Sequence, residues 1–344
     1  MSVSRSVQFL SPEEILARSS AQSERLKFPA TDSVFRDRAL RLRQLAAGHA
    51  MRDYLVFAGD IADAQHVALN TERKLKLPTP EQLDAAAGQG QPPLTPACWP
   101  LGQQWQEELQ VIVQNLLGNA KDGTPVHSAL RKLEVMDAVQ LNQQAERLLN
   151  GIMLGLDMAA APLLGAALQV YWTRLVAQTR AAQTDHTAPA FSPVDDGKVC
   201  PCCGSQPVAS VLRMGSEEGN SRYLHCALCQ TEWHMVRVKC THCESTKGIY
   251  YQELQGTSTS SPPTVAQPSG AVRAECCDAC GHYLKIVAMD KDPHVEPVAD
   301  DLASVALDLL VTETGKQRHG LNYLLLWGEP EEDEARTIAT TGVS

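Results

Sequence analysis

Hydrophobic residues recur every three to four positions through most of residues 1–182, a spacing typical of amphipathic helices. Ser11-Pro12-Glu13-Glu14 matches a capping box with proline at the first helical position, and predicts a helix from about 12 to 26. The periodicity then predicts one long or two consecutive helices over 33–71, and helices over 103–118, 124–150 and 158–182. Six prolines between 76 and 100 exclude a sustained helix there. We expect residues 1–182 to form an all-α helical bundle.

The pattern changes after a polar, proline-containing linker at 183–197. Alternation of polar and apolar residues predicts strands, separated by turns, at 207–214, 221–226, 232–238, 248–254, 271–276 and 282–289. These strands lie between four Cys-x-x-Cys pairs, so the order cysteine pair, hairpin, cysteine pair, strand occurs twice. A Ser/Pro-rich insertion at 255–270 lengthens the second hairpin. We therefore predict one metal-binding ribbon at 198–239 and another at 240–291.

The last part of the chain returns to a helical pattern. Asp292-Pro293 predicts a cap and a first helical residue, and the helix runs to about 313. Residues 292–327 are expected to form this helix and an extension, and the acidic tail at 328–344 is expected to be disordered. The predicted fold class is α+β: a helical bundle, two tandem rubredoxin-like or zinc-ribbon modules, and a C-terminal helix.

Charge and hydropathy narrow the classes of function. The net charge is −10, and residues 195–290 carry 8 Lys and Arg against 10 Asp and Glu, which argues against a nucleic-acid partner. The N-terminus lacks the apolar stretch of a secretory signal. The most apolar segment, 152–172, is interrupted by Asp157, Pro162 and Gln169, which favours a buried helix pair over a membrane span. We expect a cytoplasmic protein without membrane insertion. The sequence does not indicate its oligomeric state.

Ten of the eleven cysteines lie between residues 200 and 280. In a reducing compartment, such density favours metal ligation over disulfides. Two Cys-x-x-Cys turns across a hairpin can supply four thiolates to one tetrahedral ion, so four turns predict two sites. Cross-braced pairing of the turns is an alternative to chain order, and all-sulfur sites suit either zinc or a single iron. Chain order assigns the first site to Cys200, Cys203, Cys226 and Cys229, and the second to Cys240, Cys243, Cys277 and Cys280.

Several further side chains have both a chemical and a structural interpretation. Cys202 and Cys276 could be alternative ligands or exchanging thiols, but we favour a bystander role. The pair Asp300-Asp301 could serve acid–base chemistry, but we favour a solvated helix face. The sequence contains no phosphate-binding glycine loop, no HExxH and no nucleophile elbow, so we do not expect an enzyme. Four histidines could replace a thiolate, although surface or sulfur-neighbouring positions are favoured: His225, His234, His242 and His282.

The cysteine turns and their linking sequences resemble a known family. Segments 199–210, 222–244, 275–286 and 291–308 are together similar to the FdhE family of formate dehydrogenase accessory proteins. The resemblance implies a cytoplasmic assembly factor that binds the catalytic subunit of a respiratory molybdenum- or tungsten-dependent formate dehydrogenase and is needed for its activity. It also implies two iron ions in rubredoxin-like sites. Cys202, Cys276 and the long insertion depart from the family pattern.

Two other functions remain open from the sequence. The ribbons could transfer electrons to the active site of the client enzyme by cycling iron between its ferric and ferrous states. They could instead hold zinc as purely structural ions in an interaction module, because ribbons this short build little hydrophobic core. Iron content and a reversible one-electron couple would separate the first of these functions from the second, since zinc has no accessible redox change.

Overall fold

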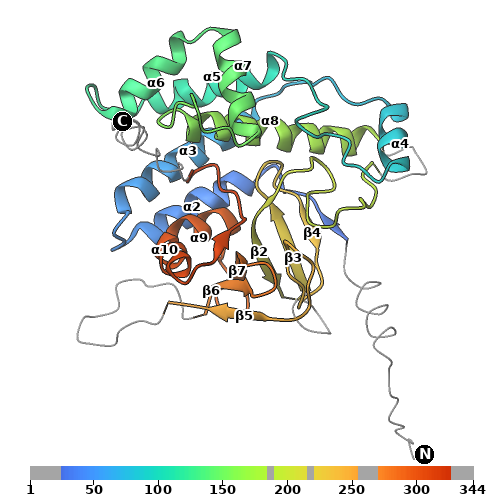
Figure 1. The fold of residues 1–344 in the computed structure, drawn as a ribbon. Coiled ribbons are helices and arrows are strands. Elements are labelled where there is room, and N and C mark those ends of the chain that lie inside the picture. Colours follow the sequence, from blue (N-terminus) through green and yellow to red (C-terminus); the bar gives the residue numbers. More distant parts are fainter. Residues whose placement is uncertain (1–24, 184–189, 215–220, 255–269, 327–344) are drawn as a thin grey trace, which may run out of the picture.

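Helices form the first half of the protein and a mixed β-sheet most of the second half, which confirms the predicted α+β class (Figure 1). The computed structural model describes residues 25–183, 190–214, 221–254 and 270–326. Most of the helix predicted at 12–26, the turn at 216–220, the insertion from 255 to 269 and the acidic tail lie outside the described residues. The helices before the sheet are α2 (Val34–Ala46), α3 (Arg52–Asn70), α4 (Pro80–Gly88), α5 (Gln104–Leu117), α6 (Pro125–Val135), α7 (Ala138–Leu149) and α8 (Ala161–Ala182).

The helix boundaries refine the sequence prediction. The 33–71 region contains two helices, and Gly48 adopts a positive φ of 71° between them. The 124–150 region is also divided, because the Asp137 side chain caps α7 by accepting a hydrogen bond from the Gln140 amide. The region 76–100, where the prolines excluded a sustained helix, contains the short helix α4; Pro80 occupies its first turn, where proline has no hydrogen bond to lose. The predicted helix pair at 152–172 was also wrong, because α8 begins only at Ala161 and is one helix.

The main hydrophobic core surrounds helix α8, which is buried along most of its length. Helices α3, α5 and α7 pack against it, and the side chains of the first two cysteine pairs belong to the same core. Among the described residues, no helix combines the length and apolar character needed to cross a membrane. Of the apolar run noted in the sequence, the part within α8 lies in the core, whereas Ile152 and Leu154 are exposed.

The strands of the two predicted ribbons join in one sheet. Its order is β1-β4-β3-β2-β7-β6-β5, and β8 pairs with β7. Within each ribbon the strands are antiparallel, whereas β2 and β7 run parallel, with Val211 opposite Val287. The parallel pair therefore joins the two ribbons edge to edge. The strands are β1 (Leu26–Lys27), β2 (Pro207–Arg213), β3 (Ser221–Cys226), β4 (Glu232–His234), β5 (Ile249–Gln252), β6 (Val272–Cys277), β7 (His282–Ala288) and β8 (Gln317–Arg318).

A buried arginine connects the two ribbons through its side chain. Arg222 of β3 lies 2.6 Å from the carboxylate of Glu275 on β6. Its guanidinium also donates to the backbone carbonyl oxygens of Arg237 and Lys239, at 3.2 and 3.0 Å. These carbonyls face Arg222 and not a neighbouring strand, which explains why β4 ends at His234 and does not continue to 238 as predicted.

The C-terminal region contains two short helices, α9 (Pro297–Ala303) and α10 (Val305–Glu313). Helix α9 packs between α2 and the sheet, and α10 packs against β6 and β8. The predicted helix start at Pro293 was wrong, because the Asp292 carboxylate binds the guanidinium of Arg41 at 2.6 Å. Glu296 caps α9 instead, by accepting a hydrogen bond from the Ala299 amide. The interpretation of Asp300 and Asp301 as a solvated face was also wrong, since both are fully buried.

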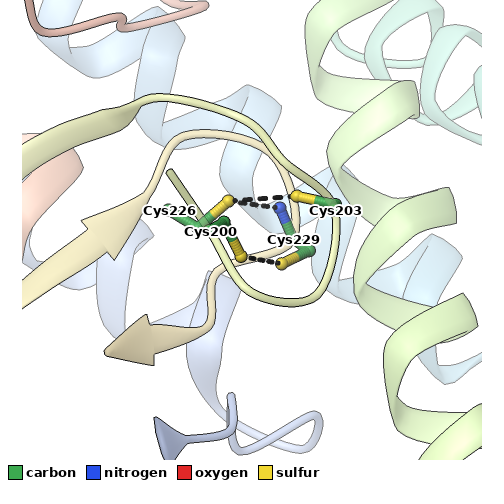
Figure 2. A group of neighbouring side chains, drawn as sticks. All are labelled: Cys200, Cys203, Cys226 and Cys229. Atoms are coloured by element: carbon green, nitrogen blue, oxygen red, sulfur yellow. Dashed lines mark hydrogen bonds between the residues drawn. The ribbon is translucent and has the colours of Figure 1, made fainter. Parts of the chain in front are cut away.

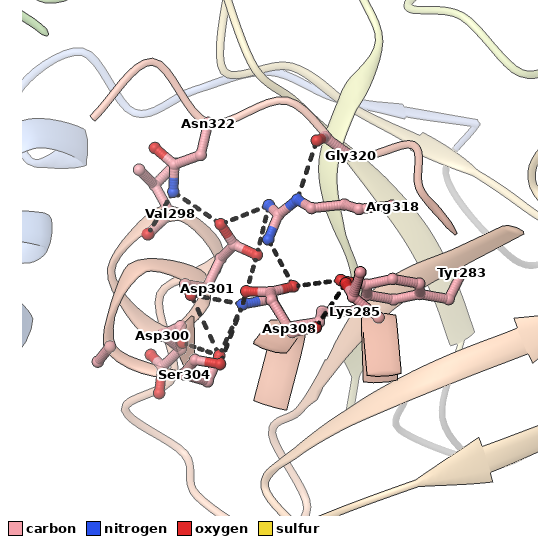
Figure 3. A network of polar contacts seen from close by, with 12 residues as sticks. Tyr283, Lys285, Val298, Asp300, Asp301, Ser304, Asp308, Arg318, Gly320 and Asn322 are labelled. Atoms are coloured by element: carbon pink, nitrogen blue, oxygen red, sulfur yellow. Dashed lines mark hydrogen bonds and ion pairs between the residues drawn. The ribbon is translucent and has the colours of Figure 1, made fainter. Parts of the chain in front are cut away.

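The Asp300 carboxylate pairs with Arg41, whereas Asp301 belongs to a network of ions with Asp308 (Figure 3). Arg318 binds both oxygens of Asp301 at 2.8 Å and one oxygen of Asp308 at 2.8 Å. Lys285 of β7 reaches the same two carboxylates, at 3.1 and 2.6 Å. Burial raises the pKa of Asp301, but Arg318 and Lys285 outweigh this effect and hold it below the usual value. Two cations thus balance two anions, and the network fastens the C-terminal helices to the centre of the sheet.

Replacing Lys285 with methionine tests the strength of this attachment. Lys285→Met leaves two carboxylates with one cation in a buried setting, so we expect a loss of about 3–5 kcal/mol in the free energy of unfolding. Arg43→Ala is the matched control, because Arg43 pairs with Asp60 and Asp63 on the surface and its loss should cost less than about 1 kcal/mol. Urea denaturation of the metal-loaded protein measures both. Equal effects of the two variants would contradict a structural role for the network.

Candidate metal centres

The four Cys-x-x-Cys turns share one backbone geometry. The residue after the second cysteine has a positive φ in every turn: Gly204 at 71°, Gln230 at 63°, Glu244 at 61° and Gly281 at 75°. This conformation reverses the chain beneath the sulfurs, and it costs a residue with a Cβ about 1–3 kcal/mol. Gln230 and Glu244 adopt a positive φ although they are not glycine. The turn therefore keeps the same backbone conformation at the two positions where no glycine indicates it.

The first centre consists of Cys200, Cys203, Cys226 and Cys229, whose sulfurs lie within 4.8 Å of one another (Figure 2). The Cys200 and Cys229 sulfurs are 3.5 Å apart, and those of Cys203 and Cys226 are 3.4 Å apart. These separations are far longer than a disulfide bond of about 2.05 Å. They approach the edge of about 3.8 Å expected for a tetrahedron with metal–sulfur bonds of about 2.3 Å. All four residues are buried.

Helix α8 and its neighbours hold the first centre in the core. Gln169, the polar residue that interrupts the apolar run, donates a hydrogen bond of 2.8 Å to the carbonyl of Ala227 between two of the cysteines. The amide of Leu94 donates to the carbonyl of Cys202 at 3.0 Å. A Cβ on Gly165 would lie 2.6 Å from the Cβ of Tyr323, so α8 also approaches the C-terminal segment closely. The helical region thus binds both turns of the first centre, and α8 also contacts the C-terminal segment.

Burial dominates the electrostatics of the first centre. It raises the pKa of the Cys200 and Cys226 thiols well above the ordinary range. At Cys229 burial acts in the same direction, but hydrogen bonds from the surrounding thiols outweigh it and lower the pKa. Backbone amides of Leu228 and Cys229 also donate to the Cys226 sulfur at 3.3 Å each. A bound cation is the charge that would allow all four sulfurs to be thiolates in this apolar setting.

A polar cluster supports the second turn of the first centre. The Arg38 guanidinium on α2 donates to the side-chain oxygen of Gln230 at 2.5 Å and to Glu296 at 3.0 Å. The His225 ring lies 3.2 Å from the same Gln230 oxygen and 3.1 Å from Glu232. Burial raises the pKa of Glu232, but hydrogen bonds from His225 and Arg213 outweigh it and lower the pKa to about 2. These contacts hold Gln230 in its unfavourable backbone conformation.

The second centre consists of Cys240, Cys243, Cys277 and Cys280, and it is much more open. The Cys240 and Cys280 sulfurs are 3.8 Å apart, and those of Cys243 and Cys277 are 3.7 Å apart, close to the tetrahedral edge. Amides of His242 and Cys243 donate to the Cys240 sulfur at 3.4 and 3.5 Å. Cys243 is exposed, whereas Cys240 and Cys277 are buried. The two centres share a local design but differ in access to solvent.

In the structure the first Cys-x-x-Cys turn meets the second and the third meets the fourth, as chain order predicts. The cross-braced alternative, in which the first turn meets the third, does not occur among the described residues. The donor sets therefore fit a tetrahedral, all-sulfur metal site at each centre. This chemistry suits zinc and a single iron equally. The structure thus contains two four-cysteine sites that can hold metal ions.

The two additional cysteines lie beside the centres, outside both groups. Cys202 is buried in the main core next to the first centre. Cys276 packs in a smaller core with Tyr283 and Val287, and burial raises the pKa of its thiol to about 11. The Cys202 thiol contacts Cys200 and Cys229 and does not point away from the centre as expected, and the bystander role of both cysteines stays a prediction.

The histidines differ from one another in their surroundings. His225 is buried, and His234 is half-buried against the ring of Tyr223. The rings of His242 and His282 stack at a centroid distance of 3.8 Å beside the second centre. His319, which the sequence analysis did not single out, lies 5.4 Å from His242. His319 follows the predicted ribbons in the sequence and belongs to no cysteine turn, so no sequence pattern pointed to its position near the second centre.

Comparisons with known proteins agree with the geometry. Three family models match the chain: FdhE, N-terminal, over residues 23–188; FdhE, central domain, over 199–237; and FdhE, C-terminal domain, over 238–325. The chain is 38% identical over 309 residues to a protein FdhE homolog of Cronobacter sakazakii, which covers 89% of this chain and 92% of that protein. It is 37% identical to protein FdhE of Salmonella newport over the same shares.

A solved structure is also similar. The crystal structure of the FdhE protein from Pseudomonas aeruginosa matches with a TM-score of 0.72 and 34% identity, over 89% of this chain and 100% of that chain. Sequence, family models and fold therefore agree across the helical region and both metal centres. The chain belongs to the FdhE family, the formate dehydrogenase accessory proteins that its cysteine-rich segments resemble.

Proposed function

We propose that the protein is a non-catalytic assembly factor in the cytoplasm. It binds the immature catalytic subunit of a respiratory molybdenum- or tungsten-dependent formate dehydrogenase and is needed for the activity of that enzyme. Two preformed four-cysteine centres in a chain of the FdhE family are the observation that carries this proposal.

The proposal assigns one iron ion to each centre. Cys200, Cys203, Cys226 and Cys229 hold the first ion, and Cys240, Cys243, Cys277 and Cys280 hold the second. Sulfur separations near the tetrahedral edge support the ligand sets, and the family resemblance supports iron over zinc. A bound ion supplies positive charge that keeps the four sulfurs ionised. The residues around it fix the turns, exclude water from the first centre and leave the second centre open.

The open second centre favours one alternative function, electron transfer to the active site of the client enzyme. Cys243 is exposed, so a partner could approach an iron at this centre closely. The first centre is enclosed by the core and does not offer this access. Metal identity separates the candidates, because zinc at the second centre would remove electron transfer and leave a structural interaction module.

Replacing one cysteine of the open centre tests the ligand assignment. We expect Cys243→Ser, purified without oxygen, to contain one metal ion per chain where the unmodified protein contains two irons. The fold should be retained, because Cys243 lies at the surface and outside the hydrophobic cores. Elemental analysis, the visible spectrum of iron–thiolate bonds and near-ultraviolet circular dichroism measure these three properties.

Cys98→Ser is the matched control, because Cys98 is exposed and belongs to neither group. It should keep both ions. If Cys243→Ser also keeps two ions, the second ligand set is wrong. If the unmodified protein contains only zinc, the iron assignment is wrong.

Association with the client tests the assembly role. A tagged copy of the protein should retain the catalytic subunit of formate dehydrogenase from cells that cannot insert the molybdenum or tungsten cofactor, and should retain less of the mature, loaded subunit. Mass spectrometry of the captured proteins measures both amounts. Absence of association, together with full formate dehydrogenase activity in a deletion strain, would contradict the assembly role.

A further inference from the structure

A third group of metal-ligating side chains lies beside the second centre. One ring nitrogen of His242, one ring nitrogen of His282 and the Cys280 sulfur lie within 4.8 Å of one another. His242 is exposed, and the other two are partly exposed. Cys280 belongs to both groups, so the two imidazoles lie on the solvent side of the second centre.

Hydrogen bonding leaves His282 ready to bind an ion. Its Nδ1 lies 2.8 Å from the backbone carbonyl oxygen of Cys280. A carbonyl oxygen can only accept, so Nδ1 carries the proton and Nε2 has a free lone pair in the neutral ring. Metal-binding histidines are commonly oriented in this way, by donating their second ring nitrogen to a carbonyl or a carboxylate.

The imidazole ring of His242 lies directly against that of His282. His242 stacks on His282 with the ring planes 11° apart, so the exposed His242 ring has to turn for both nitrogen lone pairs to point at one ion. His319 does not complete a set of three histidines, because its Nε2 lies 2.7 Å from the Thr241 hydroxyl and its ring is outside the group. The donor set is therefore two imidazoles and one thiolate.

This donor set has its own metal preference. Imidazole with thiolate suits divalent ions of intermediate softness, such as Zn²⁺, Co²⁺ and Ni²⁺. Three protein ligands leave a further position open to solvent or to an exchanging ligand. A four-thiolate centre with a divalent ion carries a charge of −2, or −1 with ferric iron, and this negative charge attracts a second cation to the shared sulfur.

We propose that His242, His282 and Cys280 form a third metal site, which takes a divalent transition-metal ion and uses the Cys280 sulfur as a bridge to the second centre. This site is additional to the two four-cysteine centres and relies on the assignment of Cys280 to the second of them. Its ion is weakly held and exposed to solvent, in contrast to the ions of the four-cysteine centres.

The experiment is a titration with Co²⁺ of protein in which both four-cysteine centres are already filled. Elemental analysis first establishes two tightly held ions per chain. Added Co²⁺ should then bind as one further equivalent, with visible bands of a mixed nitrogen and sulfur environment and shifted proton signals from two histidine rings. His242→Ala/His282→Ala should lose this equivalent and keep the two tightly held ions. Both rings are at the surface, so near-ultraviolet circular dichroism should be unchanged.

His66→Ala/His127→Ala is the matched control, because these histidines lie on α3 and α6, outside every group of metal-ligating residues found in the described part of the chain. It should bind the third equivalent as the unmodified protein does. The third site is contradicted if filled protein binds no further Co²⁺, or if the double variant at 242 and 282 binds it equally well. Fewer than two tightly held ions at the outset would contradict the two-centre proposal instead.

Discussion

Four sulfurs inside the main hydrophobic core are the constraint on which the rest of the fold depends. A thiolate without a counter-charge is strongly disfavoured there, since burial raises the pKa of thiols such as Cys200 and Cys226. A metal ion would remove that penalty, and the surrounding elements enclose the four sulfurs. Gln169 of α8 binds one cysteine turn, and Leu94 binds another. The first centre therefore acts as part of the core and not as a separate small module.

The second centre has the same backbone conformation at its turns as the first, but it is more exposed to solvent. Its cysteine turns have the same positive φ after the second cysteine, yet Cys243 is exposed and two histidine rings lie at its rim. The parallel pairing of β2 with β7 and the contact between Arg222 and Glu275 tie it to the first ribbon. The two ribbons thus carry one four-cysteine group enclosed by the core and one that is open to solvent.

Local spacing explains what could be predicted from the sequence. The cysteine turns, the hairpins and most helices follow from neighbours within a few residues, and these predictions agree with the structure. Asp300 and Asp301 were placed on a solvated face because their cations, Arg41, Lys285 and Arg318, are distant in sequence or on other elements. The pairing of β2 with β7 and the approach of His319 to the second centre are likewise long-range contacts, which periodicity does not encode.

The order in which the ions leave the protein tests most directly whether the two centres are unequal. A strong chelator added to filled protein should remove one ion per chain quickly, with no change in near-ultraviolet circular dichroism. The other ion should leave slowly, together with the loss of tertiary structure, because its sulfurs are buried in the main core. Release of both ions in one phase, or loss of the slow ion without loss of structure, would contradict a first centre that is integral to the fold.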